Sequence, residues 1–190
     1  MKALILNGSD LEDKKTSELY DLVLSELKKM NWDAVSINLK DIDLAYCTGC
    51  FGCWIKTPGE CIIKDYSASI SEQIIDSNLL IYFTPVTFGG YSSILKKALD
   101  RQICLLLPYF QKVQGEIHHK KRYEIYPSLI AVGIMDKPDA EKEEVFKPLL
   151  YRNSINMWNP YHRAIIHTKS QEPSEFCINF KESLIKVEGI

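Results

Sequence analysis

Residues 1–9 read MKALILNGS, an apolar run at 3–6 that is closed by Asn7, Gly8 and Ser9. Such a run ahead of a turn is typical of a β-strand that is buried on both faces of a sheet. From Thr16 to Met30, apolar residues recur at every third or fourth position, and two lysines stand in the last turn. The opening thirty residues therefore predict a strand followed by a helix.

The same alternation continues to the end of the chain. Further strands are predicted at 34–37, 79–83, 129–132 and 164–166. Helices are predicted around 70–74, at 94–107 ahead of Pro108, at 139–157 with a kink at Pro148, and from Pro173 onward. Residues 45–65 and the polar residues 111–124 are predicted to be loops. Five strands alternating with five helical stretches predict a three-layer, doubly wound α/β fold with a parallel sheet.

Length and charge limit the classes of function. The 190 residues are close to the size of one domain and contain no Pro-, Gly- or Ser-rich linker, so we expect a single domain over residues 1–190. Lys and Arg total 23 against 25 Asp and Glu, and this net charge of −2 gives no overall attraction to nucleic acid or to a membrane surface. Neither a targeting segment nor an apolar run of roughly 20 residues is present. We therefore expect a cytoplasmic protein without nucleic-acid or membrane partners.

The loops after residues 7, 40, 84 and 132 are the expected ligand-binding places, because doubly wound sheets bind ligands at the carboxyl ends of their strands. The first loop, GSDLEDKKTS at 8–17, leads into a helix N-terminus, where backbone amides favour a phosphate. No G-x-G-x-x-G or Walker motif occurs, which favours a single phosphate over a pyrophosphate. The alternative is an ordinary turn with Thr16 as helix N-cap. The side chains that can contact a phosphate here are Ser9, Lys15, Thr16 and Ser17.

The loop TPVTFGGYS at 84–92 places an aromatic residue and two glycines at the same sheet edge. A flat ring can pack there, with Phe88 or Tyr91 stacked on it and backbone amides bonded to its polar edge. The alternative is a plain turn in which Ser92 caps the next helix. The candidate ring-binding residues are Pro85, Val86, Thr87, Phe88, Gly89 and Gly90.

Four of the six cysteines lie in CTGCFGCWIKTPGEC at 47–61, a C-x2-C-x2-C-x7-C pattern. Four thiolates this close can hold a cubane iron–sulfur cluster, whereas a zinc site more often uses two separated pairs. A metal-free loop that packs Phe51 and Trp54 against a partner subunit is the alternative. Cys104 and Cys177 lie on apolar faces and are predicted core residues. The candidate metal ligands are Cys47, Cys50, Cys53 and Cys61.

Two further features are weaker. The basic stretch 112–122 could receive the phosphates of a nicotinamide dinucleotide, but a solvated loop is the simpler interpretation. His162 and His167 have no carboxylate pattern beside them, so a catalytic role has little support.

Together these residues resemble the flavodoxin-like NADPH-dependent FMN reductase family, and particularly its cysteine-bearing branch, which includes the iron–sulfur flavoproteins. The resemblance is carried by LILNGS at 4–9 with Thr16, by the cysteine run continued to Asp65, and by TPVTFG at 84–89 followed by LKKALDR at 95–101. The family's usual G-S-P-R-x-x-x-N-T loop appears here as Gly8-Ser9-Asp10-Leu11 with Lys15-Thr16, without the Arg and the Asn.

The resemblance implies a five-stranded sheet of order 2-1-3-4-5, noncovalent FMN, and a homodimer or homotetramer whose subunits help to enclose the flavin. By position, Ser9 and Thr16 would hold the FMN phosphate and residues 85–90 would line the isoalloxazine. The implied activity is electron transfer from NAD(P)H, the co-substrate, through FMN to a quinone, an aromatic compound or a protein. The alternatives are an electron carrier with a [4Fe-4S] cluster on the four loop cysteines, and a non-enzymatic binding protein of the same fold.

Overall fold

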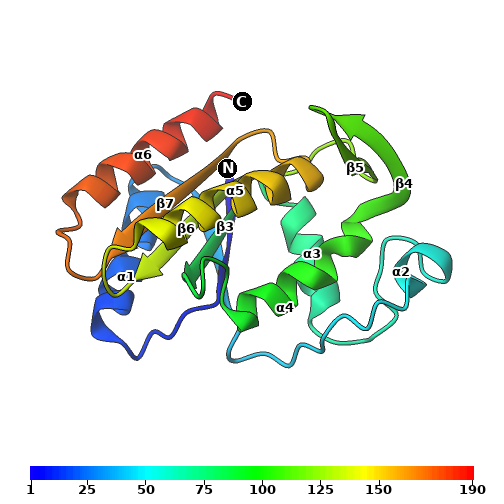
Figure 1. The fold of residues 1–190 in the computed structure, drawn as a ribbon, viewed down its shortest axis with the longest axis horizontal. Coiled ribbons are helices and arrows are strands. Elements are labelled where there is room, and N and C mark those ends of the chain that lie inside the picture. The colour runs from blue at the N-terminus through cyan, green and yellow to red at the C-terminus, as the bar shows by residue number, and fades with distance from the viewer.

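The computed structural model describes all residues 1–190. Its central sheet has five parallel strands in the order β2-β1-β3-β6-β7 (Figure 1). Numbered along the chain, the five strands have the order 2-1-3-4-5, so the predicted doubly wound α/β fold is confirmed. The strands are β1 (Lys2–Asn7), β2 (Asp33–Asn38), β3 (Leu79–Pro85), β6 (Ser128–Met135) and β7 (His162–Thr168).

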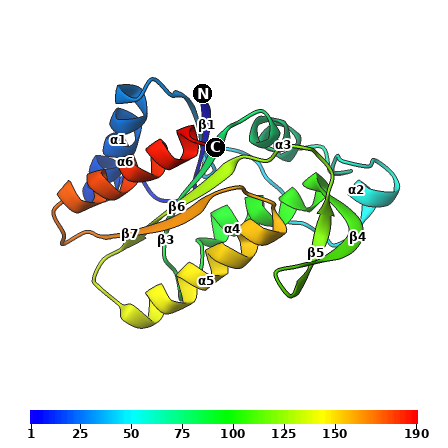
Figure 2. The same cartoon turned by 90° about the horizontal axis from the view of Figure 1, so that it is seen from above.

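Helices cover both faces of this sheet and make the three layers (Figure 2). Helices α1 (Lys14–Lys29) and α6 (Ser174–Glu188) pack on one face. Helices α3 (Ser67–Ile75), α4 (Ser93–Arg101) and α5 (Ala140–Asn156) pack on the other. Alternate residues of the central strands enter the two cores: Ile5 of β1 faces α1 and α6, whereas Leu4 and Leu6 face the other helices. Burial on both faces explains why these strands are continuous apolar runs.

Side chains at the helix starts set the geometry of the loops. Asp13, and not Thr16, is the N-cap of α1, because the Asp13 carboxylate accepts from the Thr16 backbone N–H. Ser92 caps α4, as the alternative interpretation of this loop has it, and accepts from the backbone N–H of Leu95. Its hydroxyl also donates to the carbonyl oxygen of Gly8 at 2.7 Å, which joins the first and third βα loops. Helix α5 continues through Pro148.

The segment after α4 differs from the prediction. Helix α4 ends at Arg101, a 3₁₀ turn follows at Gln102–Leu105, and residues predicted as helix end and loop form an antiparallel hairpin of β4 (Leu106–Val113) and β5 (Glu116–Lys121). Its turn has positive φ at both Gln114 and Gly115, as a two-residue hairpin turn requires. The prediction missed it because the apolar residues 105–107 continue the helical pattern of 94–107, and the polar residues 111–121 carry no apolar run. The hairpin is fastened to the body by Trp158 Nε1, which donates to the His119 carbonyl at 2.8 Å.

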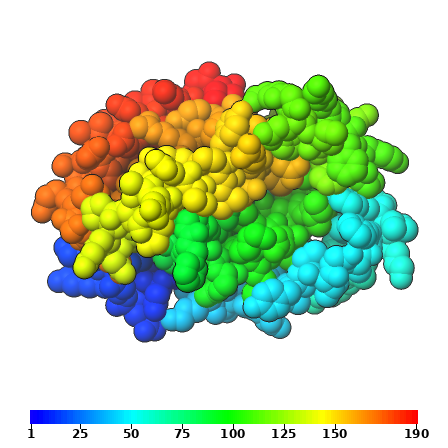
Figure 3. Space-filling view, in the orientation of Figure 1, coloured from blue at the N-terminus to red at the C-terminus, as the bar shows by residue number.

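The cysteine loop, residues 45–66, contains the short helix α2 (Gly52–Ile55) and lies beside the hairpin at one end of the molecule (Figure 3). Trp54 joins the two, since its indole N–H donates to the carbonyls of Ile103 and Leu106 and its ring packs on His119. Both chain termini lie together, away from this end (Figure 2). None of the helices has the length and apolar character needed to cross a membrane.

Candidate functional site

A cavity of about 810 Å³ opens at the carboxyl ends of β1, β3 and β6. Three loops that are distant in the sequence meet here: 9–16 after β1, 85–88 at the end of β3, and 134–139 after β6. This is the sheet edge where doubly wound folds bind ligands. Six of the ten predicted flavin-site residues line it, namely Ser9, Thr16, Pro85, Val86, Thr87 and Phe88.

The other four predicted residues do not line this cavity. Lys15 pairs with Glu18 at 3.5 Å on the surface of α1, and the Ser17 backbone N–H donates to the Asp13 carbonyl. Gly89 and Gly90 turn toward α5 instead. A Cβ atom on Gly89 would lie 2.7 Å from the Cβ of Val145, so this glycine is required by packing against the helix and not by contact with a ligand.

The hydrogen-bond donors of the first loop that could bind a phosphate already bind a carboxylate of the same chain. The Asp13 carboxylate accepts from the Thr16 backbone N–H at 2.9 Å and from the Thr16 hydroxyl at 2.7 Å, and it lies 3.1 Å from Lys169 Nζ. The hydrogen bonds from Thr16, with the nearby Lys169, lower the pKa of Asp13 to about 2. Ser9 is also engaged, because its N–H and hydroxyl donate to Asn7 Oδ1 at 2.9 and 2.7 Å. The loop is therefore an anion site that is filled by its own aspartate.

Charged residues from the far side of the cavity were not found from the sequence. Lys169, just after β7, lies 2.9 Å from Asp136 as well as 3.1 Å from Asp13. Lys142 at the start of α5 pairs with Asp139 at 2.7 Å, while Lys137 forms no ion pair. The loop after β6 was an expected ligand-binding place, but no motif marks Lys169, which reaches the site only through the fold.

The loop after β3 forms a tight turn that holds an aromatic ring in solvent. Thr87 and Gly90 exchange backbone hydrogen bonds of 2.9 and 2.8 Å, and both residues between them, Phe88 and Gly89, have positive φ. The Phe88 side chain is 94% exposed, although it lines the cavity. An exposed phenyl ring on a strained backbone favours a binding role over a packing role.

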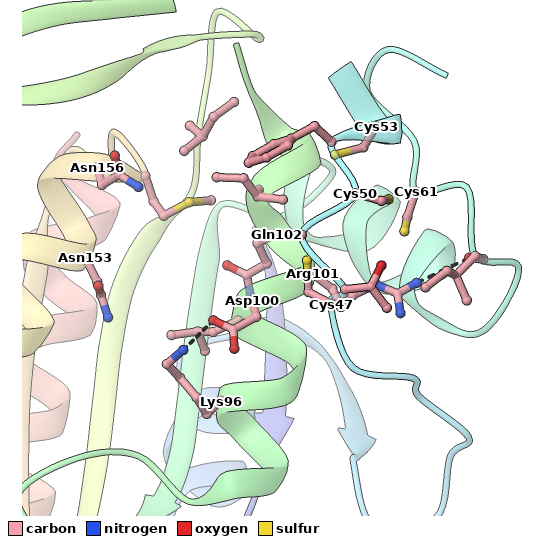
Figure 4. A pocket seen from close by; sticks show the side chains of 18 of the residues that line it. Cys47, Cys50, Cys53, Cys61, Lys96, Asp100, Arg101, Gln102, Asn153 and Asn156 are labelled. Atoms are coloured by element: carbon pink, nitrogen blue, oxygen red, sulfur yellow. Dashed lines mark hydrogen bonds and ion pairs between the residues drawn. The ribbon is translucent and has the colours of Figure 1, made fainter. Parts of the chain in front are cut away.

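The four loop cysteines line a second cavity of about 440 Å³ near the end of α4 (Figure 4). Cys47 and Cys50 are exposed, Cys61 is partly buried and Cys53 is buried. Although all four face one cavity, no three His, Cys, Asp or Glu side chains in the chain are placed to share a metal ion. Burial raises the pKa of the Cys53 thiol to about 11. In this arrangement no three of the thiols converge on one point, and the metal-ligand role of the four cysteines stays a prediction.

The Gly52 backbone N–H holds the pKa of Cys50 below its usual value. Cys50 is exposed as well, so it is the loop thiol best suited to react as a thiolate.

The cysteine loop is fastened to α4 by a buried ion pair. Arg101, which is only 3% exposed, donates to both carboxylate oxygens of Asp65 at 3.0 Å. The same guanidinium donates to the Ala45 carbonyl at 2.8 Å and to the Ser67 hydroxyl at 2.7 Å. Two of the sequence motifs, the one ending at Asp65 and the one ending at Arg101, are thus explained by one structural contact.

The remaining predicted features lie outside both cavities. The basic stretch 112–122 belongs to the hairpin, where Arg122 donates to the carbonyls of Cys104 and Leu106. His162 is partly buried and His167 is buried, and burial lowers the pKa of each. Cys104 is a buried core residue as predicted, and Cys177 is partly buried against the core of α1 and α6.

The chain is similar in sequence to curated proteins. An iron–sulfur flavoprotein from Archaeoglobus fulgidus is 33% identical over 101 residues, which make up 53% of this chain and 48% of that protein. The chain spans about half the length of the curated relatives it matches.

Solved structures extend the likeness to the rest of the chain. An NAD(P)H:quinone oxidoreductase from Methanothermobacter marburgensis matches with a TM-score of 0.67 at 11% identity, over 100% of this chain and 96% of that one. An oxidised flavodoxin from Bacillus cereus matches with a TM-score of 0.58 at 12% identity, over 98% of each chain. At these identities the likeness shows the fold, which is flavodoxin-like. The model of the NADPH-dependent FMN reductases matches residues 1–123 of the 190, and this chain belongs to that family.

Proposed function

We propose that this protein is an FMN-dependent oxidoreductase that takes electrons from NAD(P)H and passes them to a quinone, an aromatic compound or a protein. We also propose that residues 1–190 act as one FMN-binding domain. The observation that carries the proposal is the cavity at the carboxyl edge, where an exposed aromatic turn stands opposite a filled anion site at a helix N-terminus. Family membership and the name of the quinone oxidoreductase support it.

The size and chemistry of this cavity fit a flavin. Its volume of about 810 Å³ lies within the roughly 300–1,000 Å³ of small-molecule sites. The backbone N–H of Phe88 donates to no other group of the chain, so it is free to bond the polar edge of a ring. Phe88 then covers one face of the ring and excludes water from it. When bound, FMN supplies the group that accepts a hydride and passes electrons on, so no acid–base side chain is needed.

The phosphate would replace Asp13 on the donors that Asp13 now uses. Thr16 provides a backbone N–H and a hydroxyl, and Lys169 provides the positive charge that the family's missing loop arginine would supply. Ser9 lies in the same wall and can turn its hydroxyl from Asn7 to the phosphate. The FMN phosphate would take the place of the Asp13 carboxylate. The charge of the site stays balanced only when the Asp13 side chain moves into solvent.

A homodimer or homotetramer is the partner arrangement that we propose. Large apolar side chains are exposed on the cysteine loop and on the hairpin, two segments that lie at one end of the molecule (Figure 3). Where exposed apolar side chains are this numerous, we propose that a second copy of the chain covers them. The mass in solution, measured by light scattering, tests the arrangement. The exposed side chains are Tyr46, Phe51, Ile55, Tyr109, Phe110 and Ile117.

The test is the visible spectrum of protein purified and reconstituted with FMN under anaerobic conditions, followed by titration with NADH and NADPH. We expect bound flavin that one of the nicotinamides bleaches. Phe88→Ala is expected to weaken flavin binding, while Ile185→Ala, which removes an exposed apolar side chain from α6 outside the cavity, leaves it unchanged. Absence of bound flavin overturns the proposal, and bound flavin that neither nicotinamide reduces replaces it with a non-enzymatic flavin-binding protein.

An iron–sulfur electron carrier is the second candidate, and the names of the curated relatives favour it. The present arrangement of the thiols does not, because no three of them converge. Iron measured on the same anaerobic sample separates the two. We expect far less than the roughly four irons per chain of a [4Fe-4S] cluster. Stoichiometric iron with a brown absorption would establish the electron carrier instead.

A further inference from the structure

The hairpin of β4 and β5 has one edge that is bonded to the body of the protein and one that is free. The backbone of His119 in β5 is bonded on its outer side, where the N–H donates to Asn156 Oδ1 at 3.5 Å and the carbonyl accepts from Trp158 Nε1 at 2.8 Å. Both partners lie at the C-terminal end of α5 or just after it. Figures 1 and 2 both show β4 farther from α5 than β5 is. The free edge is therefore the outer side of β4.

The pairing register of the hairpin shows which backbone groups point out from this edge. Along an antiparallel pair, residues that bond each other across the strands alternate with residues whose N–H and C=O groups point to the two outer edges. His119 is of the second kind, so its cross-strand partner Phe110 is of that kind too, and Lys112 is the next such residue on β4. No group outside the hairpin bonds the backbone of Phe110 or Lys112. Two donors and two acceptors thus stand open at the edge of β4.

These four backbone groups are complementary to their own image under a two-fold axis. When two β4 strands lie antiparallel with Gln111 opposite Gln111, Phe110 of each copy faces Lys112 of the other, and the two pairs exchange four hydrogen bonds. The neighbouring registers are poorer. With Phe110 opposite itself, Lys112 would face Pro108, which has no N–H to donate. With Lys112 opposite itself, Phe110 would face Gln114, which belongs to the hairpin turn.

The side chains along the edge agree with the register centred on Gln111. Phe110 is 61% exposed, and Ile117, the cross-strand partner of Lys112 on β5, is 74% exposed. In the paired sheet, Lys112 of one copy lies between its own Ile117 and the Phe110 ring of the other copy, where an ammonium group and a ring face attract each other. The two Phe110 rings become diagonal neighbours, within reach of each other. Exposed apolar surface is thereby covered on both copies at once.

We propose that two copies of the chain join through the outer edge of β4 and form a four-stranded antiparallel sheet in the order β5-β4-β4-β5. The contact closes an open strand edge, which is otherwise a template for unwanted pairing. It deepens the proposed homo-oligomer, on which it rests, by naming the strand and the register that join two copies. It requires no bound flavin, because the hairpin does not line the cavity at the carboxyl edge of the central sheet.

Disulfide trapping tests the register. In the proposed sheet, Gln111 faces its own image in a non-hydrogen-bonded pair, whose Cα atoms lie about 4.5 Å apart, a distance that a disulfide spans. Gln111→Cys, oxidised with diamide, is therefore expected to give a covalent dimer linked through the two introduced thiols. Val113→Cys is the matched control on the same face of β4, because its two introduced thiols would lie about 14 Å apart along the strands and should not link. Peptide mapping separates this link from disulfides of the native cysteines.

The strength of association tests the backbone bonds. Lys112→Pro removes the outward N–H of each copy, and with it two of the four hydrogen bonds, but no bond within the hairpin. Lys112→Ala is its control, since it removes the same side chain and keeps the N–H. In sedimentation equilibrium, we expect the oligomer of Lys112→Pro to dissociate about 5- to 150-fold more readily than that of Lys112→Ala. If Lys112→Pro does not fold, the disulfide trapping decides the matter.

The outcomes separate this contact from the proposals on which it builds. An oligomer in which Gln111→Cys links no faster than Val113→Cys overturns the contact and leaves the homo-oligomer to another surface. Wild-type protein that is monomeric at every concentration overturns both, and leaves the edge of β4 to a strand of another protein. Flavin binding is measured by its own spectrum, so bound and reducible flavin in a monomer would uphold the oxidoreductase while refuting the contact.

Discussion

Replacing Arg101 with Met tests whether one ion pair holds the cysteine loop to the fold. The variant keeps the side-chain length but removes the hydrogen bonds to Asp65, Ala45, Ile63 and Ser67. The Arg101 and Asp65 side chains are only 2% and 8% exposed, so the variant leaves a buried carboxylate without its cation. Breaking such a pair costs about 3–5 kcal/mol. In a chain of this size, that loss lowers Tm by about 6–20 °C.

The assay is urea unfolding and thermal melting, together with limited proteolysis under native conditions. Cleavage within residues 45–66 should become faster in Arg101→Met, because the loop loses its attachment. Lys96→Met is the matched control on the same helix, since its pair with Asp100 is exposed and contributes less than about 1 kcal/mol. If Arg101→Met costs no more than this control, the ion pair does not hold the loop and the reasoning is refuted.

The pH dependence of this variant follows from Asp65. Burial pushes the pKa of Asp65 up, but hydrogen bonds from Ser67 and Ala45 and the charge of Arg101 outweigh it and leave the pKa lowered. The group therefore stabilises the wild type at pH values above its unfolded pKa of about 3.9, and this stability is lost as pH falls through the lower folded pKa. The stability difference between wild type and Arg101→Met should shrink below about pH 4. A difference that stays constant down to pH 2 would mean that Asp65 is not the partner that matters.

Three other predictions concern the loops. Asp13→Asn should raise FMN affinity about tenfold and leave riboflavin affinity unchanged, because Asn still caps α1 but no longer places a charge where the phosphate binds. Fluorescence titration with both flavins measures the two affinities, and an equal gain for riboflavin would contradict the prediction. Gly89→Ala should lower the free energy of unfolding in urea by more than Gly49→Ala does. Both glycines have positive φ, but only at Gly89 would the new methyl group meet Val145. Equal losses, each about 1–2 kcal/mol, would show that packing on α5 is unimportant. Cys50 should react with iodoacetamide well before Cys53 at pH 8, because the pKa of Cys50 is lowered and burial raises the pKa of Cys53 to about 11. Peptide mapping of the labelled protein measures this order, and simultaneous labelling would contradict the buried placement of Cys53.

The sequence predicted those elements whose buried residues follow a regular local pattern of apolar positions. The strand β6 is buried along its whole length and reads as an apolar run, and α1 places an apolar residue on its inner face at every turn. The hairpin β4–β5 could not be found in this way, because it packs by its backbone and by the contacts of Trp54 and Trp158. Lys169 could not be found either, since it meets Asp136 only because β7 ends beside the loop after β6, and it meets Asp13 only because the loop after β1 lies at the same sheet edge.

The first loop carries three carboxylates, Asp10, Glu12 and Asp13, which repel a phosphate, and the structure shows how the loop can still accept one. Asp10 accepts from the Glu12 N–H and lies 3.4 Å from Lys40, which also pairs with Glu12 at 3.5 Å. These two carboxylates are neutralised on the β2 side and do not line up on the helix N-terminus. Only Asp13 stands on the donors of α1, and it stands there as an anion. The loop thus has the electrostatics of a phosphate site, and its own Asp13 carboxylate occupies that site. For tight FMN binding, the geometry therefore calls for removal of the Asp13 carboxylate rather than for restoration of the family's arginine.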